Sequence, residues 1–216
     1  MNTAGLSLRE GWTLLVLVLF ASALSAIAPA DRLTWALEIV PVFIGLVLVL
    51  VTRRNFPLTP LLYRLLVIHA LILILGAHYT YAGTPVGFWA QDLFGFERNH
   101  YDRLGHFAQG FIPAVLAREI LVRCSPLKSG AWLFFIVVCV CLAFSAFYEL
   151  LEWWAAAIGG DAANEFLGTQ GDPWDTQWDM FLALTGAIVS LLLLRHLHNA
   201  QLKRMGVVSR AHDLRD

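Results

Sequence analysis

Charged side chains are scarce in this chain. Asp, Glu, Lys and Arg make up 14% of its 216 residues, whereas hydrophobic residues make up 58%. Average soluble proteins carry about 25% charged residues, so there is too little charge here to cover a solvated surface. The high hydrophobic content also excludes an intrinsically disordered chain. We therefore expect lipid to cover much of the molecule.

Cysteine is also scarce, and linker sequence is missing. Three cysteines are too few for a disulfide-rich scaffold, and Cys139 and Cys141 do not have the Cys-x-x-Cys spacing of a redox motif. No internal repeat, Gly/Ser linker or low-complexity segment interrupts the sequence. Residues 1–216 are therefore predicted to form a single integral membrane domain with short connections.

Six segments have the length and composition of membrane crossings. A helix needs about 20 residues to cross the hydrocarbon core of a bilayer, which is roughly 30 Å thick. The segments are residues 12–28, 33–51, 61–77, 101–122, 131–157 and 173–194. They predict an all-α polytopic membrane bundle of six transmembrane helices. The longest loops are expected at residues 79–100 and 158–172.

Basic residues divide unequally between the two sides of this bundle. With the amino terminus in the cytoplasm, 12 of the 15 Lys and Arg residues lie on the cytoplasmic side, and the other three are Arg32, Arg98 and Arg103. Lys- and Arg-rich loops stay in the cytoplasm, so both termini are predicted there, with residues 196–216 as a basic tail. Glu119 is interpreted as a residue of the cytoplasmic interface.

The basic side has a second interpretation, as a surface for a cytoplasmic partner or for anionic lipid. Membrane lipid is the expected partner of the chain. No motif identifies a protein partner. Nucleic-acid binding is not expected, because the basic residues follow the loops and the tail without a fold that would present them to a nucleic acid.

Polar side chains gather at one end of the last three segments. Residues three or four apart share a helix face, and the acids and the histidine of these segments follow that spacing. At about 1.5 Å of rise per residue, the deeper ones reach a common layer in the outer leaflet. The predicted polar site comprises Asp102, His106, Glu149, Glu152, Asp172, Asp175 and Asp179, supported by Glu38, Arg103, Gln109 and Gln177.

Several of these residues also have a structural explanation. Asp172 before Pro173 is typical of the N-cap and first position of a helix, and Asp175 suits the positive end of the same helix. Asp102 lies in the first turn of its helix and can pair with Arg103 or Arg98. Glu149 and Glu152 are harder to explain in this way, because the negative end of a helix disfavours anions.

Several carboxylates a few ångströms apart cannot all ionise unless a cation balances them. Either some of them are protonated or a positive group binds. A divalent metal held by carboxylate oxygens and an imidazole would neutralise the cluster, and a water bound to that metal could serve in hydrolysis or transfer. The candidate metal ligands are His106, Glu149, Glu152, Asp175 and Asp179. A lipid head group is the alternative ligand.

Three stretches of the sequence, Tyr101–Phe107, Tyr148–Trp153 and Gly168–Met180, resemble the YjdF family of bacterial inner-membrane proteins. The resemblance covers residues 10–200. It implies a multi-pass protein of the bacterial inner membrane and supplies no reaction, because the family itself is uncharacterised.

The segment Asp102–Phe107 is also similar to the Asp-[Lys/Arg]-x-x-His-Phe pattern of VanZ-like membrane proteins. Their later Asp-x-x-x-Asn-x-x-Gly-Ala pattern is met in part, with Ala183 in place of the asparagine.

Three functions fit these observations. In the first, the polar site is not catalytic and the chain is a scaffold or binding protein of the inner membrane. It could otherwise belong to a metal-dependent enzyme that acts on a lipid-linked substrate, or to a proton- or cation-coupled transporter. A transporter needs polar groups that continue to the cytoplasm, and the inner halves of the helices offer little beyond His69.

Overall fold

The computed structural model describes residues 5–159 and 170–207, and all regular structure in these two ranges is helical. The predicted all-α class is therefore confirmed. The long helices are α1 (Leu8–Ser25), α2 (Arg32–Thr52), α3 (Pro60–Tyr79), α5 (Tyr101–Cys124), α6 (Ala131–Gly159) and α8 (Asp175–Met205). Two short helices, η1 (Tyr81–Gly83) and α4 (Pro85–Phe94), lie between α3 and α5.

Five of the long helices are long and apolar enough to cross a membrane, and these are α1, α2, α3, α6 and α8. The remaining long helix, α5, is more polar and carries both Asp102 and Glu119. It packs against α3, α6 and α8, and more of its residues are buried than in any other described helix. Its polar side chains are therefore enclosed by protein.

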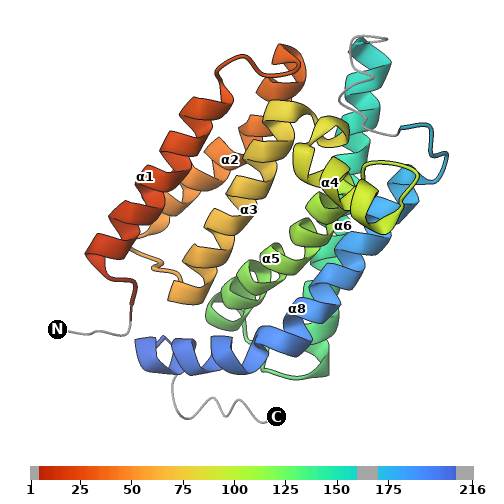
Figure 1. Ribbon diagram of the computed structural model, residues 1–216. Helices are drawn as coiled ribbons and strands as arrows, with labels where there is room; N and C mark the ends of the chain where they lie inside the picture. Colours follow the sequence, from red (N-terminus) through yellow and green to blue (C-terminus); the bar gives the residue numbers. More distant parts are fainter. Residues whose placement is uncertain (1–4, 160–169, 208–216) are drawn as a thin grey trace.

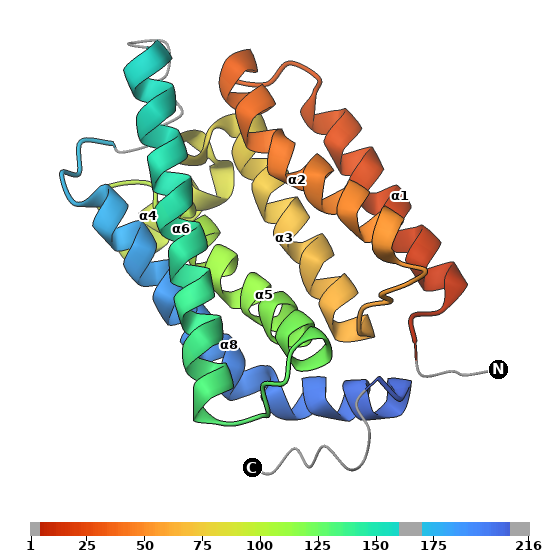
Figure 2. The ribbon, with the colours of Figure 1, turned by 180° about the vertical axis from the view of Figure 1, so that it is seen from behind.

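The long helices run back and forth along the bundle (Figure 1). The helix α1 begins and the helix α8 ends at the same end, which we call the base (Figures 1 and 2). The short helix α4 lies at the opposite end, which we call the α4 end. Residues that begin α5 and α8 and residues that end α6 therefore meet at the α4 end.

Helix starts follow the capping residues of the sequence. The Ser7 hydroxyl accepts a hydrogen bond from Glu10 N (3.2 Å) at the start of α1, and Asp31 Oδ1 accepts one from Thr34 N (2.7 Å) at the start of α2. The hydrogen bonds that Asp31 accepts from Thr34 lower the pKa of Asp31. The first expected segment, 12–28, is shifted, since α1 spans 8–25 and Ala28 has a positive φ of 50° that no helix contains.

The expected loop at residues 79–100 contains a helix. Pro85 occupies the first turn of α4, where its missing N–H costs nothing, and Gly95 ends the helix with a left-handed φ of 68°. Ten residues are too few to cross a bilayer, so α4 does not have the sequence pattern of a membrane crossing. Residues 160–169, inside the second expected loop, lie outside the described residues.

The last helix differs most from its expected span of 173–194. Asp172 does not cap it: Asp172 Oδ1 accepts a hydrogen bond from Trp174 N (2.9 Å), and α8 begins at Asp175. The helix then continues to Met205, and its last turns run across the base (Figures 1 and 2). Residues 196–205 of the expected basic tail are therefore helical, with His198 and Leu202 buried. Residues 208–216 lie outside the described part of the chain.

Glycines bring α5 and α8 into close contact. A Cβ atom on Gly110 would lie 1.8 Å from the carbonyl oxygen of Ala183, and one on Gly186 would lie 2.2 Å from that of Phe107. Only residues without a Cβ allow two helix backbones to approach so closely. Because the obstructing atoms belong to the backbone, they cannot move aside without separating the helices.

We expect Gly186→Ala to lower stability by about 1 to 3 kcal/mol, the usual cost of overpacking a core. Gly45→Ala in α2 is the matched control, because nothing lies within 4 Å of its added Cβ. Thermal unfolding of the purified proteins in detergent measures both. Equal unfolding temperatures for Gly186→Ala and the wild type would show that the two helices do not need this glycine.

Candidate functional site

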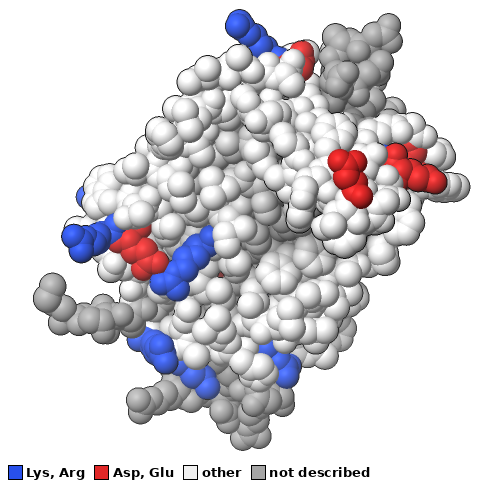
Figure 3. Space-filling view, in the orientation of Figure 1, with Lys and Arg blue, Asp and Glu red and all other residues white. Residues whose placement is uncertain are grey.

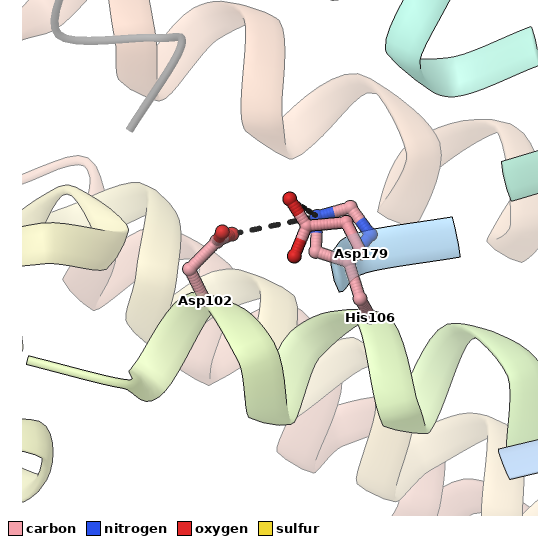
Figure 4. A group of neighbouring side chains, drawn as sticks. All are labelled: Asp102, His106 and Asp179. Carbon is pink, nitrogen blue, oxygen red and sulfur yellow. Dashed lines mark ion pairs between the residues drawn. The ribbon is translucent and has the colours of Figure 1, made fainter. Parts of the chain in front are cut away.

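A buried polar cluster lies at the α4 end, between α5, α6 and α8. Asp102 and His106 are one turn apart on α5, Asp179 approaches from α8 (Figure 4), and Glu149 belongs to α6. His106, Asp179 and Glu149 expose only 5%, 2% and 8% of their surface. Three helices that are distant in sequence thus place one imidazole among three carboxylates.

The imidazole of His106 lies at the centre of the cluster. Its Nε2 is 3.5 Å from Asp102 Oδ1 and 3.8 Å from Asp179 Oδ2, and its Nδ1 is 3.8 Å from Glu149 Oε1. Ligand atoms of Asp102, His106 and Asp179 all lie within 4.8 Å of one another, and so do those of His106, Glu149 and Glu152. The histidine therefore belongs to two groups, each with two carboxylates.

Several polar atoms in this cluster have no hydrogen-bond partner. They are His106 Nδ1, Glu149 Oε1 and Asp179 Oδ1. Buried polar atoms are nearly always paired with protein or water, because an unpaired one costs about 1 to 3 kcal/mol. Two of them, His106 Nδ1 and Glu149 Oε1, face each other at 3.8 Å, which is too long for a hydrogen bond.

The nearby arginines bind other acids. Arg98 Nη2 lies 2.6 Å from Asp175 Oδ1, and Arg103 Nη2 lies 2.8 Å from Asp172 Oδ2. The two acids at the start of α8 are thus separated from the cluster by their ion pairs. Asp175 was an expected metal ligand; it pairs with Arg98 and is not in either group of possible ligand atoms, so its role as a ligand stays a prediction. Asp102 pairs with His106 rather than with Arg103.

Positive charge is therefore short at the centre of the cluster. Among the ion pairs of the described residues, none joins a Lys or Arg to Asp102, Glu149 or Asp179. His100, just before α5, adds no charge at neutral pH, because its partial burial and the charge of Arg103 lower its pKa. One imidazole cannot balance three enclosed carboxylates.

The supporting residues lie in different places. Tyr148 donates a hydrogen bond from its hydroxyl to Glu38 Oε2 (3.3 Å), which ties α2 to α6 beside the cluster. Arg103 stacks over the ring of Trp178 at 5.2 Å. Gln177 is exposed and Gln109 is half-buried, and neither is among the ligand groups. The structure therefore brings together Asp102, His106, Glu149, Glu152 and Asp179 out of the predicted set.

A second buried network, at the base, was not predicted. Glu119 is fully buried, and its carboxylate accepts hydrogen bonds from the backbone N (3.1 Å) and the hydroxyl (2.8 Å) of Thr59. It also accepts one from Arg123 Nη1 (2.8 Å) and lies 3.0 Å from His198 Nε2. The interpretation of Glu119 as an interface residue is thus wrong. Its i,i+4 spacing to Arg123 was the only signal in the sequence.

The protonation of His198 follows from its neighbours. Arg118 Nη1 lies 2.9 Å from His198 Nδ1. Because a guanidinium can only donate, Nδ1 accepts this hydrogen bond, and in the neutral ring Nε2 then carries the proton and donates to Glu119. The network joins the end of α8 to α5 and to the residues that precede α3, and its carboxylate has all its partners.

The fold and the comparisons together assign the class of the protein. Five apolar helices of membrane-spanning length around an enclosed polar helix define an integral membrane protein. Residues 11–200 match the family described as "Predicted membrane protein (DUF2238)", and the chain belongs to this family.

A relative confirms the assignment. The chain is 50% identical over 209 residues to "Inner membrane protein YjdF" of Escherichia coli (strain K12), a match that covers 97% of this chain and 95% of that protein. The expected location in the bacterial inner membrane and the resemblance to YjdF are thereby confirmed. No solved structure matches the chain.

We expect Glu119→Ala to destabilise the protein by about 3 to 5 kcal/mol, because it leaves Arg123, whose side chain is largely enclosed, without its counter-charge. The matched control is Glu10→Ala, which removes an ion pair of similar length, 2.7 Å to Arg64, from the exposed surface. Surface pairs contribute little, so this variant should unfold like the wild type. Unfolding of the purified proteins in detergent compares the two variants. Equal losses of stability would mean that burial of the network does not add to its contribution.

Proposed function

We propose that this inner-membrane protein binds one divalent transition-metal ion at the α4 end, through Asp102, His106 and Asp179. The observation that carries the proposal is the geometry of the buried cluster: His106 Nε2 lies 3.5 Å from Asp102 Oδ1 and 3.8 Å from Asp179 Oδ2, and Oδ1 of Asp179 has no hydrogen-bond partner. A cation would satisfy these atoms and also balance the carboxylates around them.

The distances support a metal rather than direct hydrogen bonds. Separations of 3.5 and 3.8 Å are too long for hydrogen bonds between these groups. Two ligands at about 2.1 Å from a tetrahedral ion lie about 3.4 Å from each other. One imidazole nitrogen with carboxylate oxygens suits zinc or manganese, whereas calcium and magnesium prefer sites made of oxygen alone.

Glu149 has a distinct role in this proposal. When Nε2 of a histidine binds a metal, Nδ1 usually donates its proton to a carboxylate or carbonyl, which orients the ring. Glu149 Oε1 is the carboxylate nearest to Nδ1 of His106, at 3.8 Å. Glu149 would therefore position His106, and Glu152 would lie beside it.

We further propose that α5 is the sixth crossing and that the base is cytoplasmic. All 24 residues of α5 form one helix, long enough to span the membrane, and its neighbours shield its polar groups from lipid. Lys and Arg gather at the base in Figure 3, whereas much of the acidic surface lies nearer the α4 end. By the positive-inside rule the metal site would then face the periplasm.

The apolar middle of the bundle argues against a transporter. His106 and Arg118 are separated by roughly 18 Å along α5, at 1.5 Å per residue. Between them lie the buried side chains of Ala114, which packs with Ala187 and Leu191 of α8, and Val115, which packs with Leu62 of α3. The described residues thus offer no chain of polar groups from the cluster to the base.

A metal-dependent enzyme acting on a lipid-linked substrate is the second candidate. Asp102 and Glu152 are partly exposed, whereas His106 and Asp179 are buried. The cluster therefore has an accessible edge at the level of the outer head groups, where a substrate could reach a bound metal. In such a site the metal would polarise the substrate or activate a water.

The metal test uses protein purified without chelator. We expect about one zinc or manganese ion per chain by elemental analysis, lost on treatment with a chelator and regained on titration. Asp179→Asn and His106→Ala should bind little metal, and Glu149→Gln should bind it about 10- to 100-fold more weakly. Binding should also weaken at acidic pH, because protons compete for the ligands.

Asp92→Asn is the matched control for this test, because Asp92 is an exposed acid of α4 at the same end of the bundle. It should bind metal like the wild type. Folded wild-type protein that takes up neither zinc nor manganese would refute the proposal. Equal losses in Asp92→Asn and Asp179→Asn would also refute it, since they would indicate a nonspecific acidic surface.

The crossing of α5 has its own test. Alkaline phosphatase is active only in the periplasm, so we expect activity when it is fused after Gly95, which precedes α5, and none when it is fused after Ser129, which follows it. Equal activity at the two positions would show that α5 does not cross the membrane. Fluorescent protein fused at Ser129 provides the reciprocal readout.

A further inference from the structure

A second candidate site lies at the base, in a cavity of about 610 Å³ between α5, α6 and α8. One part of its wall is polar and basic, formed by Arg118, Arg195 and Asn199. The other part is apolar, formed by Leu133, Phe134 and Leu191. Among the described residues, no acid lines it. The cavity is separate from the metal cluster, and nothing in it depends on metal binding.

Arg118 is a buried cation that forms no ion pair with a carboxylate in the part of the chain that the structure describes. Its surface is 6% exposed, and its guanidinium donates to His198 Nδ1 (2.9 Å), Asn199 Oδ1 (2.6 Å) and Ser129 Oγ (3.4 Å). All three acceptors are neutral. The adjacent Glu119 is ion-paired with Arg123 (2.8 Å) and forms no ion pair with Arg118 in the described residues. An enclosed charge with only neutral partners is costly unless a counter-ion binds.

A guanidinium has five N–H groups, and the three hydrogen bonds of Arg118 use three of them. The other two form no hydrogen bond with the residues named above. The neutral partners hold the guanidinium in place, so little side-chain entropy would be lost on binding.

The cavity contains a second source of positive charge. Arg195 is exposed, lines the same wall and forms no ion pair with a described carboxylate. The first turn of the long helix α6 also borders the cavity, at Ala131 and Leu133, where backbone N–H groups have no partner within the helix. Two guanidinium groups and a helix start thus surround one space, and no acid from residues 5–159 or 170–207 lines it.

We propose that this cavity binds an anionic phosphate group, either the head group of a phospholipid or free phosphate, between Arg118 and Arg195. Arginine matches phosphate oxygens with paired N–H groups. The apolar wall favours the lipid, because an acyl chain could lie against Leu133, Phe134 and Leu191. Basic pockets between membrane helices recognise anionic lipids in this way.

The test is native mass spectrometry of delipidated protein with phosphatidylglycerol, with phosphatidylcholine of the same acyl chains, and with inorganic phosphate as a competitor. We expect wild-type protein to prefer phosphatidylglycerol. Arg195→Gln should weaken this binding about fivefold, the effect of one basic residue near an anionic lipid. Arg195→Lys, which keeps the charge, should recover most of it.

The matched control is Arg204→Gln, because Arg204 is an exposed arginine of the same helix that does not line the cavity. It should bind like the wild type. Competition by inorganic phosphate would identify free phosphate as a ligand, and no competition would identify the lipid. The proposal is overturned if Arg195→Gln binds phosphatidylglycerol as tightly as the wild type, or if Arg204→Gln loses as much binding.

Discussion

The close contact between α5 and α8 is the constraint on which the candidate metal site depends. Gly110 and Gly186 leave no Cβ between the two backbones, so the helices approach more closely than other residues would allow. His106 lies one turn from Gly110 on α5 and Asp179 lies two turns from Gly186 on α8, and the close approach brings His106 Nε2 to 3.8 Å from Asp179 Oδ2. If α5 and α8 lay further apart, His106 and Asp179 would be buried separately without partners and would not form one site.

The polar network at the base and the polar cluster at the α4 end differ in how many of their atoms have hydrogen-bond partners. At the base, the carboxylate of Glu119 has partners on Thr59, Arg123 and His198. At the α4 end, His106 and Asp179 keep unpaired atoms despite their burial. A network whose polar atoms all have partners needs no ligand and can join helix ends. A cluster of carboxylates with unpaired atoms in a low-dielectric interior favours binding of a cation. Function therefore follows from the sites rather than from the helical fold.

Much of the helical architecture was predictable, because a bilayer imposes its thickness on the sequence. Four helices, α2, α3, α5 and α6, agree with their expected spans to within two residues at each end. Hydrophobic segments of bilayer length do not reveal α4, which is too short, or the last turns of α8, which run across the base. Both are positioned by packing and by turn residues such as Gly95.

Taken alone, the sequence determined the class of the protein, its location and the helix faces that carry Asp102, His106, Glu149 and Asp179. Hydrophobic length and the helical period of 3.6 residues are local properties, so they can be read without coordinates. Only the tertiary structure decided that Asp175 pairs with Arg98, that Glu119 is enclosed and that Arg118 donates to neutral groups. These contacts join residues of different helices, and they depend on how the helices rotate and approach one another, which no local pattern encodes.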